Sequence, residues 1–184
     1  MRDEEAKRLI QSARALARDR LADLAKRWDR EATFPTESIK AVSENGLLGL
    51  PISTSYGGLG ADLPLVCRIL EEIGAGCVST SLVLVMHWIS LFYLGDWCEQ
   101  PGEVADADLL QQLRVRVFND VVKNGALLTN CYGEPGSGAN VFLPFTQARS
   151  IKGGWVVTGK KFGTSAKEAQ YIQFHASIPE GEHA

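Results

Sequence analysis

The chain has 184 residues, of which 45% are hydrophobic and 22% are charged, and its formal net charge is −3. This composition is that of a folded globular protein, and the length suffices for one large domain or two small ones. The slightly acidic balance gives no electrostatic basis for binding nucleic acid or an anionic membrane, so neither is expected as a partner.

The start of the chain and its cysteines indicate the compartment. The charged first residues, Met-Arg-Asp-Glu-Glu, are not followed by the apolar core of a signal peptide, which favours a cytoplasmic location. Because the cysteines form no Cys-x-x-Cys pair, we expect reduced, mostly buried thiols without a disulfide or a metal site. They are Cys67, Cys77, Cys98 and Cys131.

The first 125 residues carry a helical pattern, in which apolar residues recur at three- and four-residue steps. Asp62 is placed to cap a helix at its N-terminus, and Gly46 and Gly125 to end helices in the left-handed conformation. The pattern predicts about five helices, covering residues 4–28, 36–45, 63–73, 82–94 and 108–123.

The expected helix over residues 82–94 is apolar on nearly every face, with Ser79-Thr80-Ser81 as its predicted cap. The apolar run is too short to span a bilayer, which favours a helix buried in a bundle or at a subunit contact. His87 lies inside it, with no carboxylate or cysteine at helical spacing. We therefore interpret His87 as a hydrogen-bonded core histidine rather than a catalytic one.

Beyond residue 126 the apolar period changes from about 3.6 to 2, which predicts a domain boundary and a β-rich second part. Residues 145–151 and 155–162 flank Lys152-Gly153-Gly154 and predict a β-hairpin. Residues 171–178 alternate apolar and polar side chains, as a half-buried strand does. We expect the strands of this part to be antiparallel, and His175 and His183 to lie at its surface.

The segment 130–140 is the strongest candidate for a functional site. It follows the apolar run 126–128, so it is expected where a strand breaks into a tight turn, and it has three glycines in six residues. Exposed N–H groups of such a turn form an anion-binding surface that suits a flavin or a nucleotide diphosphate. The alternative is an ordinary glycine-rich turn, because the segment lacks the phosphate-loop lysine and the Rossmann spacing.

The amino-acid sequence of this segment resembles a motif of a known protein family. Glu134-Pro135-Gly136-Ser137-Gly138-Ala139-Asn140 is similar to the Thr-Glu-Pro-Gly-(Ala/Ser)-Gly-Ser-Asp signature of the acyl-CoA dehydrogenases. Three other segments resemble the family in the right order, and together the four span nearly the whole chain. They are the Pro-x-x-x-x-Tyr-Gly-Gly-x-Gly-like residues 51–60, the Glu-Glu-Ile-Gly of residues 71–74, and the hairpin residues 153–162.

The resemblance implies an α+β chain with an N-terminal all-α helical bundle followed by part of an antiparallel β-barrel. Residues 1–125 would form the N-terminal helical domain and residues 126–184 the first part of the middle β domain. Family members are roughly twice as long, so the C-terminal helical bundle is expected to be absent. The family also implies FAD as cofactor, an acyl-CoA substrate, an electron-transfer flavoprotein or other acceptor, and a homo-oligomer.

Site residues follow from the resemblance position by position. Gly133 stands where the family has a threonine that bonds the flavin near N5, Ala139 stands on the substrate side, and Gly163 stands where an aromatic residue packs on the flavin. The family's catalytic glutamate is expected beyond this chain, and Glu134 is expected to be a structural turn carboxylate. The predicted cofactor-binding residues are Cys131, Gly133, Glu134, Gly136, Ser137, Gly138, Gly163, Thr164 and Ser165.

Three functions remain open on these residues. The first is α,β-desaturation of an acyl-CoA thioester by an FAD-dependent dehydrogenase. The second is a monooxygenase on the same fold that uses reduced flavin and oxygen, which is compatible with the loss of the threonine and of the aromatic wall. The third is a flavin-free subunit that pairs with an active partner.

Overall fold

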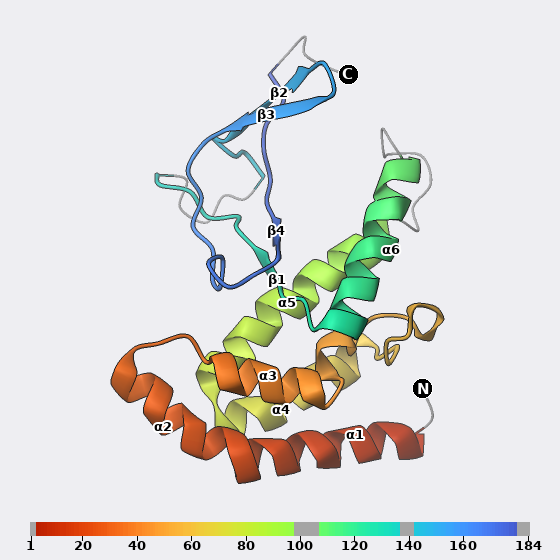
Figure 1. Ribbon diagram of the computed structural model, residues 1–184, viewed down its shortest axis with the longest axis vertical. Helices are drawn as coiled ribbons and strands as arrows, with labels where there is room; N and C mark the ends of the chain where they lie inside the picture. The colour runs from red at the N-terminus through yellow and green to blue at the C-terminus, as the bar shows by residue number, and fades with distance from the viewer. Residues whose placement is uncertain (1–2, 98–106, 137–141, 180–184) are drawn as a thin grey trace.

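The computed structural model describes residues 3–97, 107–136 and 142–179, and shows a layer of helices from which a small β region extends (Figure 1). The helices are α1 (Asp3–Leu16), the π-helical turn η1 (Ala17–Leu21), α2 (Ala22–Glu31), α3 (Thr36–Glu44), the 3-10 turns η2 (Leu47–Gly49) and η3 (Thr54–Tyr56), α4 (Leu63–Gly76), α5 (Val78–Trp97) and α6 (Ala107–Asn124). The strands are β1 (Leu128–Asn130), β2 (Gln147–Ile151), β3 (Gly154–Thr158) and β4 (Tyr171–Gln173).

The first expected helix is present as α1, η1 and α2 in succession, and the π-helical turn between them was not predicted. This turn packs closely on the end of α4. A Cβ atom added at Gly76 would lie 2.5 Å from the carbonyl oxygen of Ala17, so only glycine allows the two backbones to approach this closely. The turn therefore serves packing between α4 and the N-terminal helix.

Three of the predicted helix ends are confirmed. The Asp62 side chain accepts a hydrogen bond from the backbone N–H of Leu65 at 3.1 Å, which caps α4. Gly46 after α3 has φ of 70° and Gly125 after α6 has φ of 68°, the left-handed conformation that closes a helix.

The prediction for α5 was wrong in its start and length. α4 continues through Gly74 to Gly76, only Cys77 separates the two helices, and Ser79-Thr80-Ser81 lie inside α5 instead of capping it. With 20 residues, α5 is long enough to cross a membrane, and its window Val78–Gly95 has a mean hydropathy of 1.6. The argument from shortness therefore fails. What holds α5 in the protein is its packing against α4 and β1, with 39% of that window buried.

The β region contains two separate two-stranded sheets among the described residues. β2 and β3 form the predicted hairpin and are antiparallel, with Gly153 at φ of 85° in the turn between them. β1 and β4 instead pair in parallel, with Leu128 opposite Tyr171. This differs from the expected antiparallel order, because the alternation that identifies a strand does not reveal its direction.

The alternation of residues 171–178 is present, and its apolar side is the more exposed one. Ile172, Phe174 and Ile178 are 48%, 41% and 43% exposed, whereas Tyr171 and Gln173 are half-buried. Only Tyr171–Gln173 form a ladder with β1. The apolar side of this strand thus lies at the surface of the described part of the chain.

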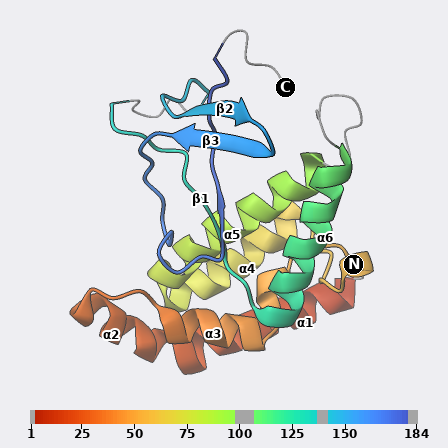
Figure 2. The same cartoon turned by 45° about the horizontal axis from the view of Figure 1, so that its top comes forward.

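His87 joins the helical core to β1, as expected for a core histidine. It is completely buried, its Nδ1 accepts the backbone N–H of Leu128 at 3.0 Å, and its Nε2 donates to the carbonyl of Leu48 at 3.1 Å. Burial lowers the pKa of His87 to about 4, so the ring is neutral at pH 7. Figure 2 shows the result: β1 and β4 rise side by side from the helical layer and carry the hairpin away from it.

Candidate functional site

A hollow of about 400 Å³ opens where β1 runs into the glycine-rich segment. α5 supplies one wall, the end of β1 and the residues after it supply the second, and the segment after β3 supplies the third. The lining residues are Met86, Asn130, Tyr132, Gly133, Phe162, Gly163 and Thr164. Three of the predicted cofactor-binding residues, Gly133, Gly163 and Thr164, therefore lie around one hollow.

Gly133 and Phe162 tie two walls of the hollow together. The backbone N–H of Phe162 donates to the Gly133 carbonyl at 2.8 Å. A Cβ atom at Gly133 would meet only Phe162, at 3.8 Å and 3.9 Å, which are ordinary contact distances. Hence no contact of a Cβ atom requires glycine at this position.

At Gly163, in contrast, the side chain of Cys131 takes the space that a Cβ atom would occupy. A Cβ atom at this position would lie 2.0 Å from the Sγ of Cys131, so the thiol fills the space that any side chain at Gly163 would need. Cys131 is buried against Gly163, and burial raises the pKa of its thiol, which the Lys161 charge partly opposes. The absence of an aromatic side chain at position 163 and the burial of the Cys131 thiol are thus two consequences of the same packing.

Glu134 is a structural anchor, as expected. Its buried carboxylate accepts the backbone N–H groups of Phe145 and Thr146, the latter at 2.9 Å, and Lys161 Nζ lies 2.7 Å from its Oε1. Burial alone would raise the pKa of Glu134, but Lys161 and the hydrogen bonds from residues 145 and 146 outweigh it and lower the pKa to about 2. A carboxylate held this way is a poor proton acceptor near neutral pH.

A cluster of aromatic side chains packs along one side of the hollow. The Tyr132 ring stacks on His175 at a centroid distance of 4.3 Å and meets Tyr93 of α5 edge-on at 6.4 Å. Burial raises the pKa of Tyr132 to about 12, so its phenol stays protonated. Asn130, on the same side of the strand, donates to the carbonyl of Met86 at 3.4 Å. These contacts fix β1 against α5.

The other predicted residues lie in different settings. Ser165 has φ of 64° and its Oγ is buried, while Gly136 occupies the turn with φ of 83°. Ser137, Gly138 and Ala139 fall outside the described residues. Cofactor contact by each of these residues stays a prediction, as does an exposed N–H row over residues 133–138.

Four lining residues were not among the predicted cofactor-binding residues, although two of them belong to the candidate segment 130–140: Met86, Asn130, Tyr132 and Phe162. Asn130 and Tyr132 alternate with the predicted Cys131, so the two-residue period of the strand could have identified them. Phe162 is adjacent to Gly163 in the sequence. Met86 reaches the hollow only through the packing of α5 on β1, for which the sequence holds no local signal.

The comparisons of sequence with known proteins indicate one family. Residues 3–96, more than half of the chain, match the acyl-CoA dehydrogenase N-terminal domain. Human mitochondrial short-chain specific acyl-CoA dehydrogenase is 30% identical over 170 residues, which cover 92% of this chain and 39% of that protein (Homo sapiens). The sequence match thus includes the helical layer and most of the β region.

Solved structures show the same fold. FMN-bound TdsC from Paenibacillus sp. A11-2, described as a dibenzothiophene monooxygenase, has a TM-score of 0.74 and 23% identity, covering 93% of this chain and 40% of that chain. The FAD complex of PigA has a TM-score of 0.76 and 21% identity, with coverage of 96% and 45%.

The helical layer with its attached strands therefore has the acyl-CoA dehydrogenase-like fold. The chain belongs to the acyl-CoA dehydrogenase family. It spans about two fifths of the length of the curated relatives it matches.

Proposed function

We propose that this chain forms the N-terminal part of an FAD-dependent acyl-CoA dehydrogenase that desaturates an acyl-CoA thioester between its α and β carbons. The observation that carries this proposal is the hollow at the end of β1, where Gly133 of the family signature and the Gly163-Thr164 segment face each other. Family membership supports this class of reaction, and the hollow is where we propose that the flavin binds.

The residues of the hollow suit a flat ring system. Gly133 has no side chain, so a planar molecule can approach its backbone closely, whereas the space beside Gly163 is filled by the Sγ of Cys131. Thr164 offers a hydroxyl and Gly133 a backbone N–H as candidate donors, while Met86 and Phe162 offer apolar contact. Donors placed beside a reduced flavin stabilise its negative charge.

When bound, FAD would accept the hydride that leaves the β carbon. The chain itself would orient the ring and exclude water from one side. Tyr132, held by its stack on His175, would keep that wall rigid. Glu134 would serve only as an anchor, because Lys161 and two backbone N–H groups already bind its carboxylate. The proton acceptor of the dehydrogenation must then come from elsewhere.

A flavin monooxygenase is the second candidate, and one observation favours it. The Sγ of Cys131 occupies the space beside Gly163, where the aromatic wall expected of a dehydrogenase is absent. The likeness in fold to TdsC, described as a monooxygenase, is consistent with this alternative. The partners would differ accordingly: acyl-CoA and an electron-transfer flavoprotein for the dehydrogenase, reduced flavin and oxygen for the monooxygenase.

Visible absorbance of the full-length protein as purified separates these functions. Flavin bands near ~450 nm that bleach on addition of an acyl-CoA would support the dehydrogenase. Colourless protein that takes up reduced flavin and consumes oxygen would support the monooxygenase. Failure to take up flavin in either redox state would contradict both and leave a flavin-free partner subunit. The mass of the purified complex would test the proposed homo-oligomer.

Residues 1–184 alone should show no dehydrogenase activity when saturated with FAD, because a half-open site neither excludes water nor holds substrate and base in place. The measurement is acyl-CoA oxidation with an artificial electron acceptor, beside the full-length protein. Turnover by the short chain, abolished by Glu134→Gln, would show that Glu134 is the base after all. A full-length Glu134→Gln variant that retains the pH profile of the wild type would confirm the anchor role.

A further inference from the structure

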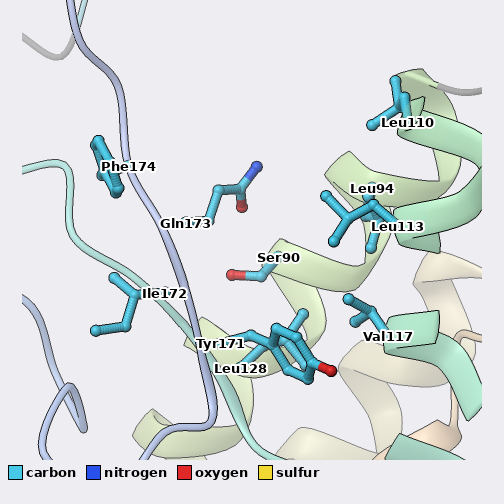
Figure 3. Close-up of a pocket in the computed structure, with 10 residues that line it drawn as sticks. All are labelled: Ser90, Leu94, Leu110, Leu113, Val117, Leu128, Tyr171, Ile172, Gln173 and Phe174. Carbon is cyan, nitrogen blue, oxygen red and sulfur yellow. The ribbon is translucent and has the colours of Figure 1, made fainter. Parts of the chain in front are cut away.

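A second cavity lies between α5, α6 and β4, away from the residues predicted to bind the flavin (Figure 3). It measures about 280 Å³. The lining residues are Ser90, Leu94, Leu110, Leu113, Val117, Leu128, Tyr171, Ile172, Gln173 and Phe174. None of them belongs to the predicted flavin site, so the cavity calls for its own explanation.

Among the described residues, the wall of this cavity is mainly apolar and carries no charged side chain. Leucines of α5 and α6 face the strand, Tyr171 and Gln173 extend toward these helices, and Ile172 and Phe174 lie on the far side of the strand (Figure 3). The Tyr171 hydroxyl, the one ionisable group in the wall, already donates to Asp120. A charged molecule would lose its hydration here without gaining a partner, so the lining selects for an uncharged one.

Two polar side chains interrupt the apolar wall. Ser90 Oγ donates to the carbonyl of Met86 at 2.9 Å, which leaves its lone pairs as acceptors. Gln173 extends from β4 between the strand and the helices (Figure 3), and its Oε1 is buried without a hydrogen-bond partner among the described residues. A buried carbonyl oxygen without a donor is unfavourable, and a small rotation of the amide would present it to a donor in the cavity.

We propose that this cavity is a binding site for a small uncharged amphipathic molecule, with an aliphatic body and one hydroxyl or primary amide group that donates to Gln173. The apolar lining takes the aliphatic body, and Gln173 and Ser90 orient the polar end. At about 30 Å³ for each non-hydrogen atom, the cavity holds about nine such atoms, the size of octan-1-ol. The proposal goes beyond the flavin chemistry, since the ligand carries no charge and no nucleotide.

The test is calorimetric titration of the whole chain with octan-1-ol, octanamide and octanoate at pH 7. The two uncharged compounds should bind at one site each, and octanoate at least about ten-fold more weakly, because its carboxylate would be buried without a cation. Equal binding of octanoate would overturn the proposal. So would the lack of saturable binding by both uncharged compounds, which would mean that the cavity is only a packing void.

Variants locate the binding. Leu113→Trp should abolish it by filling the cavity from its half-exposed rim, whereas Leu109→Trp, the same change at an exposed position of α6, should leave it unchanged. Gln173→Leu should weaken octan-1-ol binding by about 3- to 10-fold, the loss of one hydrogen bond. Wild-type affinity in Leu113→Trp or in Gln173→Leu would refute the assignment. Flavin uptake, measured on the same samples, should not change, so this result is independent of the proposed dehydrogenase.

Discussion

The helical layer and the β region differ in how they bury their apolar side chains. Leu21, Leu48 and Ile69 of the helical layer are at most 2% exposed and belong to one continuous core. Trp155 and Val156 of the hairpin are 46% and 48% exposed. A core supplies most of the free energy of folding, so the helical layer has the means to fold by itself and the hairpin does not.

The β region joins this core through Leu127 and Leu128, and specific contacts hold the rest of it. His87 accepts the backbone N–H of Leu128, Gln170 accepts that of Leu127, and Glu134 fastens the turn to residues 145 and 146. These contacts are polar and directional, whereas the helical core depends on apolar packing. The comparison shows that the candidate flavin site lies at the joint between a well-packed region and a tethered one.

Matched isoleucine variants test this comparison most strongly. Ile69→Ala in α4 removes a fully buried side chain and should lower the free energy of unfolding by about 2–5 kcal/mol. Ile151→Ala in β2, where the side chain is 53% exposed, should cost less than about 1 kcal/mol. Urea denaturation followed by circular dichroism measures both. Equal losses would show that the hairpin has a core of its own.

Lowering the pH should destabilise the connection between the helical layer and the β region, because His87 becomes protonated on unfolding. The folded pKa of about 4 lies below the unfolded value of 6.5, so the unfolded chain binds more protons between these values and stability falls as pH falls. Between pH 6.5 and 4.5, the free energy of unfolding should drop by about 2–3 kcal/mol from this group. The lowered pKa of Glu134 acts in the same direction but only below pH 4.5, outside that window.

His87→Gln is the matched control for this pH dependence. Its amide keeps one donor and one acceptor but does not titrate, so the slope between pH 6.5 and 4.5 should disappear while most of the stability at pH 7 is retained. A slope that persists in His87→Gln would assign the pH dependence to other groups and contradict the role of His87.

The sequence predicted local features well and long-range ones poorly. Asp62, Gly46 and Gly125 end helices because their own conformations and side chains do so, and such signals are visible in a short window. The pairing of Leu128 with Tyr171 and the contact of Cys131 with Gly163 join residues more than thirty positions apart. Those depend on packing between elements, which no window of sequence contains.

The candidate site shows the same division. Gly133, Gly163 and Thr164 were predicted from the wording of two segments and do line one hollow, although their contact with a flavin stays a prediction. Met86 was missed because it comes from a helix whose packing on β1 is a tertiary property. The exposure of Ile172 could not be predicted, since alternation identifies two sides of a strand but not which of them faces the core.

Gly163 tests how tightly the site is packed. Gly163→Ala should lower the free energy of unfolding by about 1–3 kcal/mol, because its methyl group would overlap the Sγ of Cys131. Adding Cys131→Ala removes that atom and leaves the closest contacts at 3.1 Å, so the double variant should regain part of the loss. Thermal denaturation of the two single variants and the double variant gives the coupling. Additive losses would show that the thiol does not exclude a side chain here.

Gly133 should give the smallest change in stability and the clearest one in cofactor binding. A threonine there meets only ordinary contacts with Phe162, and Gly133 is not among the residues with positive φ, so Gly133→Thr should shift the free energy of unfolding by less than about 0.5 kcal/mol. Its hydroxyl adds a donor at the wall of the hollow. For the proposed flavin site, FAD affinity of the full-length protein should then rise by about 3- to 10-fold, the effect of one hydrogen bond.

Gly133→Val, which has nearly the same shape but no hydroxyl, is the matched control and should give no increase. Equal gains in both variants would point to rigidification of the turn, and no gain in Gly133→Thr would place the flavin elsewhere than at Gly133.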